Sequence, residues 1–159
     1  MPDDLYTRDI LQWSAQQAAL LRRLAAGERV NDVDWPNVID EVESVGRSEM
    51  RACPGLLFQA IRHMLKIAGW PLHPAIGHWT RETLAFLDDA ERAFAPSMRQ
   101  NIDIADLYTR ALGRMRFDEM HEQPPGPLPP HCPFTLDDLL DPDRDIRALL
   151  ARLDAPPAR

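Results

Sequence analysis

Apolar residues recur at helical spacing along nearly the whole chain, and this period constrains the fold more than any other feature of the sequence. After Asp34 they occupy positions i, i+3, i+4, i+7 and i+10 (Trp35, Val38, Ile39, Val42 and Val45). Such spacing places them on one face of a helix, and no segment shows the apolar–polar alternation of a half-buried strand. The sequence therefore predicts an all-α fold: a helical bundle of about five main helices plus one or two short C-terminal helices.

Capping residues and glycines give the expected helix boundaries. The main helices are expected over residues 4–26, 34–46, 49–69, 75–95 and 97–120. Asp4 and Asp34 can cap the first two helices, Gly27 can end the first in the left-handed conformation, and Gly46 is expected to end the second. Pro54 should kink the third helix or delay its start.

A proline-rich segment interrupts the helical pattern near the C-terminus. Six of the 15 prolines lie within residues 124–133. We expect a helical bundle core over residues 1–123, an irregular segment over 124–133, and short C-terminal helices over 134–155. Thr135 can cap the first short helix, with Phe134 and Leu139 at the flanking apolar positions. A chain of 159 residues fits one domain, so the short helices are expected to pack on the same domain.

The charge and cysteine content narrow the classes of function. Lys and Arg number 18 against 25 Asp and Glu, which gives a net charge of −7. That balance argues against nucleic acid or an anionic membrane as the main partner. We expect no signal peptide, and no apolar run is long enough to span a membrane. The two cysteines fit a reduced compartment, so we expect a cytoplasmic protein.

Several short motifs, taken in order, resemble those of the DUF29 family, a group of bacterial proteins of unknown function. The matching stretches are Leu5-Tyr6, Trp13, residues 16–21, Asp34-Trp35 with Asn37, residues 41–49, residues 63–66, His78-Trp79, residues 132–136 and Leu140-Asp141. The resemblance covers residues 5–143, although Ile67 stands where members often have Trp. It implies an all-helical fold and a bacterial origin, and it supplies no activity.

The glutamate-rich stretch is the first candidate site. Glu41 and Glu43 diverge by about 200° around a helix, so they cannot share a metal ion unaided. Glu43 and Arg47 stand four residues apart, in the order that favours an ion pair. Three interpretations remain open here: a solvated face, a groove lined by Glu43 and Arg47, or a metal site built on Glu43.

The second candidate is the single polar stripe on the apolar helix expected over residues 49–69. It consists of Gln59, Arg62, His63 and Lys66, which follow the spacing i, i+3, i+4 and i+7. The stripe can be the solvent-facing edge of a core helix, an internal seam, or a ligand pocket. In the seam, Lys66 or His63 would meet Glu43 or Glu41 from the preceding helix.

No catalytic motif is present, and the histidines and cysteines do not follow a known zinc spacing. We therefore expect no metal or cofactor and assign no catalytic residue. The favoured hypothesis is a non-catalytic protein-interaction module whose partner is an unknown protein or a second copy of the chain. The alternative is a small hydrolytic or nucleic-acid-processing enzyme that uses Glu43, His63 and Lys66. Convergence of these three side chains in an open pocket would favour the enzyme.

Overall fold

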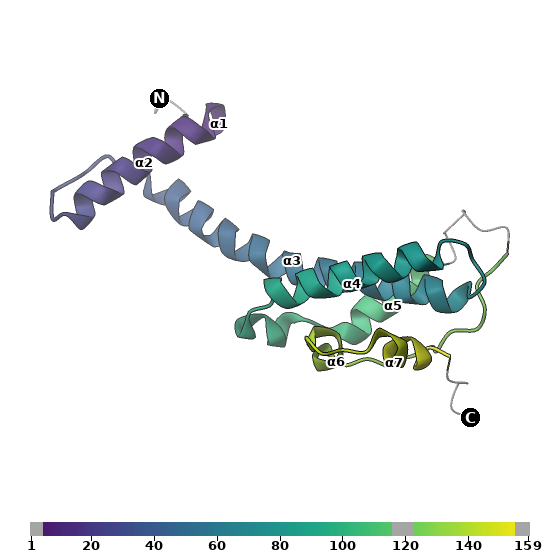
Figure 1. Cartoon of the computed structure of the whole chain (residues 1–159). Coiled ribbons are helices and arrows are strands. Elements are labelled where there is room, and N and C mark those ends of the chain that lie inside the picture. Colours follow the sequence, from purple (N-terminus) through teal and green to yellow (C-terminus); the bar gives the residue numbers. More distant parts are fainter. Residues whose placement is uncertain (1–4, 116–122, 155–159) are drawn as a thin grey trace. The chain divides into compact units, whose positions relative to one another are not determined.

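The computed structural model describes residues 5–115 and 123–154, and every regular element in them is a helix (Figure 1). In chain order these are α1 (Leu5–Arg8), α2 (Ile10–Ala25), α3 (Trp35–Gly69), α4 (Ile76–Ala93), the 3₁₀ helix η1 (Pro96–Asn101), α5 (Ile104–Met115), α6 (Leu136–Leu140) and α7 (Ile146–Ala151). The predicted all-α class is confirmed. Several helices begin or end at other residues than the sequence predicted.

Asp9 divides the first predicted helix into α1 and α2. Its carboxylate accepts a hydrogen bond from the backbone N–H of Gln12 at 3.0 Å. This bond satisfies one of the donors that a helix start leaves without an intrahelical partner. After α2, Gly27 adopts a φ of +86°, the left-handed conformation predicted for it. The predicted cap Asp4 lies outside the described residues.

Helix α3 is continuous, so the helix end predicted at Gly46 is wrong. Arg47 bonds to Glu43 and Asp40, one and two turns earlier, at 3.3 Å each, and these pairs span Gly46. A single glycine costs a helix only about 1 kcal/mol relative to alanine, which such contacts can offset. Pro54 also lies inside α3 and does not delay its start. Many of the residues that follow Pro54 in α3 are buried, and their burial stabilises the helix there.

The 3₁₀ helix η1 and α5 replace the single helix predicted over residues 97–120. Asp103 accounts for the break, because its carboxylate accepts from the backbone N–H of Asp106 at 3.0 Å and so caps α5. Ser97 and Gln100 have the S-x-x-Q spacing of a helix capping box, yet they lie inside η1 and do not start a long helix. Residues 116–120 lie outside the described part of the chain.

The chain divides into two compact units, and α3 contributes to both. Unit 1 comprises residues 1–48 and unit 2 comprises residues 49–159. Within the described residues of unit 1, three side chains are buried, those of Trp13, Gln17 and Val33. The large hydrophobic core belongs to unit 2. The predicted organisation as one domain stays a prediction.

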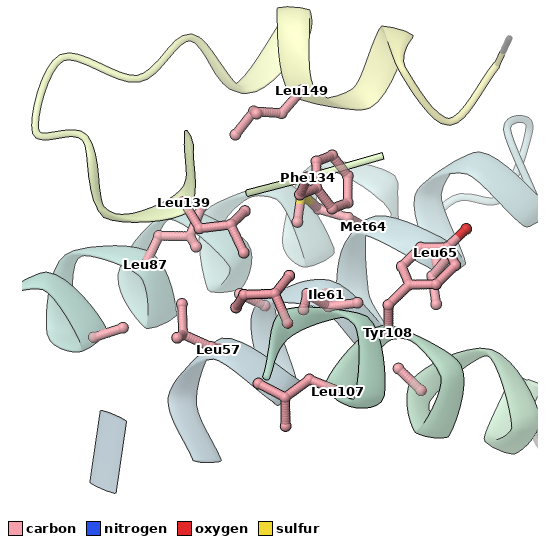
Figure 2. Packing of buried hydrophobic residues seen from close by; sticks show 14 of the residues in the cluster. Leu57, Ile61, Met64, Leu65, Leu87, Leu107, Tyr108, Phe134, Leu139 and Leu149 are labelled. Carbon is pink, nitrogen blue, oxygen red and sulfur yellow. The ribbon is translucent and has the colours of Figure 1, made fainter. Parts of the chain in front are cut away.

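The core of unit 2 is built around the second part of α3 (Figure 2). Leu57, Ile61, Met64 and Leu65 are fully buried there, as the apolar composition of this stretch predicts. The other core side chains labelled in Figure 2 come from α4, α5 and the C-terminal segment (Leu87, Leu107, Tyr108, Phe134, Leu139 and Leu149). Side chains from α3, α4, α5 and the C-terminal segment thus share one apolar interior.

Hydrogen bonds fix the described part of the proline-rich segment to this core. The Tyr108 hydroxyl donates to the carbonyl oxygen of Pro129 at 2.6 Å, and the Gly126 N–H donates to Gly69 at 2.8 Å. Beyond it, Thr135 caps α6 by accepting from the Asp138 N–H at 3.1 Å. The apolar residues predicted to flank that cap, Phe134 and Leu139, are both buried in the core.

Candidate functional site

A network of polar groups centred on Asp34 joins α2 to the start of α3 within unit 1. The Asp34 carboxylate accepts from the indole N–H of Trp13 at 3.0 Å and from the side-chain amide of Asn37 at 2.7 Å. Its backbone N–H donates to the buried side-chain oxygen of Gln17 at 2.8 Å. The bonds from Asn37, and then from Trp13, lower the pKa of Asp34 below its usual value. These polar residues therefore hold the helices of unit 1 together.

Glu41, one of the predicted site residues, belongs to the same structural framework. The Tyr6 hydroxyl donates to its carboxylate at 2.6 Å, and the Tyr6 ring packs edge-on against Trp13 with centroids 4.9 Å apart. The hydrogen bond to Glu41 is the main reason that the pKa of Tyr6 is raised to about 12. Glu41 thus connects α1 to α3 within unit 1.

In unit 1, the apolar residues of α3 lie mainly on the side of the helix that faces solvent. Trp35, Ile39, Val42 and Val45 of α3, which we call the exposed stripe, leave 51%, 54%, 69% and 63% of their surface open to solvent. On another side of the same turns, the half-buried residues are mostly polar (Asn37, Glu41 and Ser44, with Val38). The first part of α3 therefore turns its polar side inward and leaves its apolar side uncovered.

Glu43 and Arg47 come together as the sequence predicts. The Arg47 guanidinium lies 3.3 Å from the Glu43 carboxylate and 3.3 Å from that of Asp40. All three side chains are about half exposed or more, so the network contributes at most about 1 kcal/mol per pair. It borders the exposed stripe on α3.

In unit 2, the polar stripe of α3 meets α4. The imidazole Nε2 of His63 lies 2.7 Å from the Glu82 carboxylate, whose other oxygen lies 3.3 Å from Nε2 of His78. The other ring nitrogen of His63 faces the backbone oxygen of Gln59 at 2.8 Å. The structure therefore pairs His63 with Glu82 and not with Glu43 or Glu41, the partners that the seam interpretation gave it. That interpretation needed the preceding helix to fold back at Gly46, and α3 continues through it.

Lys66 extends the same polar region along the α3–α4 contact. Its side chain is buried, at 8% exposure, and its ammonium lies 5.6 Å from the centre of the Trp79 ring. The His73 ring also stacks on Trp79, with ring centroids 4.6 Å apart. Arg62 is half-buried beside it on α3. The role of Arg62, His63 and Lys66 as a site stays a prediction.

Chemically, the cluster of His63, Glu82 and His78 is a carboxylate placed between two imidazoles. Such a carboxylate can orient a histidine, although both nitrogens of His63 already face oxygen acceptors. Among residues 5–115 and 123–154, no group of three or more His, Cys, Asp or Glu side chains is placed to hold a metal ion. Sequence reasoning missed Glu82. Its spacing of four residues from His78 on α4 was the available signal.

A shallow cavity of about 510 Å³ lies elsewhere in unit 2, between the end of α4, η1 and α6. Three acidic side chains, one arginine and two apolar side chains line it (Glu91, Phe94, Arg99, Asp137, Leu140 and Asp141). Arg99 pairs with Asp137 at 2.8 Å. Of these residues, only Leu140 and Asp141 stand in a motif noted in the sequence, and none was predicted as a site residue.

The described elements define an all-helical protein, and no helix among them is both long enough and apolar enough to cross a membrane. The family model for the domain of unknown function DUF29 matches residues 5–144. The chain therefore belongs to the DUF29 family, as its motifs indicated.

A solved structure shares the all-helical fold. The chain is similar to an alpha-helical protein of unknown function from Rhodospirillum rubrum, with 30% sequence identity and a TM-score of 0.69. The match covers 93% of this chain and 96% of the other. Among curated proteins, no sequence matches the chain.

Proposed function

We propose that this protein is a non-catalytic interaction module that presents the exposed stripe of α3 to another protein. The observation that carries the proposal is the exposure of Trp35, Ile39, Val42 and Val45, which form one continuous apolar row on a helix. Together they expose on the order of 500 Å² of apolar surface, and apolar patches of about 300–600 Å² on a monomer are often functional.

The composition of the exposed stripe supports a protein partner. A tryptophan at one end and β-branched side chains along the row are rigid groups, and tryptophan is enriched among residues that dominate binding energy. Charged side chains border the row at Asp40, Glu43 and Arg47. An apolar centre with a polar rim is the usual arrangement of a specific protein interface.

The enzyme alternative receives less support. It required Glu43, His63 and Lys66 to converge in an open pocket. Glu43 instead pairs with Arg47, and His63 pairs with Glu82. We also propose that the protein works in the bacterial cytoplasm, in agreement with its two free cysteines and with its relative in Rhodospirillum rubrum.

Photo-cross-linking in cells of the native host tests the proposal. The photoreactive residue p-benzoylphenylalanine replaces Ile39, in the middle of the exposed stripe. The matched control replaces Leu72, an apolar residue that is 96% exposed in unit 2, outside the stripe. We expect a cross-linked product from position 39 and none from position 72. Absence of any product from position 39, or equal yields from both positions, would contradict the proposal.

A further inference from the structure

We propose that the partner of the exposed stripe is a second copy of this chain, and that the two α3 helices pair antiparallel through Trp35, Ile39, Val42 and Val45. This inference rests on the proposed function, because it names the protein that covers the surface. Each copy contributes the first part of α3 to a shared apolar seam, and its α2 lies on the other side of α3 from that seam.

The core of unit 1 is small, so this unit would gain stability from a partner that covers its apolar side. Unit 1 spans 48 residues, and its described part buries Trp13, Gln17 and Val33 alone. Units below about 40 residues usually need oligomerisation, a metal or disulfides, and one this size is close to that limit. Its sequence contains no cysteine. A second copy would bury the apolar side of α3 that unit 1 itself leaves open.

The exposed stripe can match a copy of itself. A two-fold interface brings the same patch of both subunits together, so the patch must be self-complementary. A row without charged side chains meets this requirement, whereas two acidic surfaces of a protein with net charge −7 would repel each other. The row supplies more than half of the about 800 Å² per partner found in stable interfaces, and the bordering side chains can supply the rest.

The helix dipoles of α3 favour the antiparallel orientation. Two parallel helices would place the like ends of their dipoles side by side, whereas an antiparallel pair opposes the two dipoles favourably.

Disulfide trapping of the full chain tests both the partner and the orientation. The stripe runs from residue 35 to residue 45, so its centre falls near Asp40. In an antiparallel pair, two copies of residue 39 are offset by about 3 Å along the helix axis, whereas two copies of residue 35 are about 15 Å apart. A disulfide needs Cα atoms within about 7 Å. We therefore compare Ile39→Cys with Trp35→Cys under mild oxidation.

We expect a disulfide-linked dimer from Ile39→Cys and only the wild-type background, from Cys53 and Cys132, for Trp35→Cys. Circular dichroism confirms that each variant is helical. Cross-linking of both positions 35 and 39 would overturn the antiparallel orientation. If Ile39→Cys does not cross-link while folded, the second copy is excluded. A photo-cross-link from position 39 to a different protein would then leave the proposed function standing, and its absence would remove both.

Discussion

Single polar residues decide much of the local structure of this protein, and Asp34 is the clearest case. The sequence predicted it only as a helix cap. In the fold its carboxylate also accepts from Trp13 of α2. A helix cap is local, so the residue spacing in the sequence predicts it. A hydrogen bond between two helices depends instead on how the connection over residues 26–34 places α3 against α2. The two roles together explain why unit 1 holds its shape with so few buried apolar side chains.

Replacing Asp34 with alanine should loosen α2. The change leaves the indole N–H of the buried Trp13 without its acceptor, which costs about 1–3 kcal/mol. We expect the amides of α2 to exchange with deuterium roughly five- to hundredfold faster, as measured by mass spectrometry. Asp32→Ala, an exposed aspartate two residues earlier, is the control. Unchanged exchange in α2 of the Asp34 variant would show that the network contributes little.

Asp138 should make stability depend on pH in the acidic range. The bidentate bond from Arg152, followed by the N–H of Thr135, lowers its pKa to about 2. A carboxyl whose pKa is lower in the folded state stabilises the fold above its unfolded pKa near 4. That stabilisation is lost as the pH falls from about 4 to about 2.

The variant Asp138→Asn measures this contribution. We expect urea unfolding to show a loss of about 1–2 kcal/mol at pH 6, from the weakened cap and the lost ion pair. The difference from wild type should shrink by at least half at pH 2.5. An equal loss at both pH values would mean that the carboxylate charge is not what stabilises α6.

At the scale of the elements, the helices themselves were predictable and their ends were less so. Apolar periodicity predicted every long helix, and Gly27 and Thr135 took the roles assigned to them. Gly46 did not, because side-chain pairs across it and the burial of later turns outweigh the weak preference of one glycine. The α3–α4 contact between His63 and Glu82 was missed, since it depends on which helices pack together.

Two glycines of α3 should respond oppositely to alanine. A Cβ at Gly46 would meet nothing within 4 Å, so Gly46→Ala should stabilise the protein by about 0.5–1 kcal/mol through its higher helix propensity. A Cβ at Gly69 would lie 2.9 Å from Pro125 Cβ, so Gly69→Ala should destabilise it. Urea unfolding followed by circular dichroism gives both values. A loss of stability in Gly46→Ala would restore the predicted helix break.

At the scale of the whole molecule, the sequence indicated an apolar face on residues 35–45 but not whether it would be covered. The prediction of a helical bundle assumed that the apolar face of each helix packs against other helices of the same chain. Here the polar side of that stretch faces its neighbours and the apolar side remains exposed. The spacing of apolar residues shows only that a helix has an apolar face. The direction in which it points depends on the polar contacts made by Asp34 and Glu41.

Sedimentation equilibrium of the full chain tests this account most directly. Over a range of concentration on the order of a hundredfold, mass action should move the wild type toward twice its chain mass of 18.1 kDa. Val42→Lys places a charge in the exposed stripe and should remain at 18.1 kDa, while Leu72→Lys should behave like the wild type. A wild-type mass of 18.1 kDa at every concentration, or a Val42→Lys variant that associates like the wild type, would contradict pairing through this stripe.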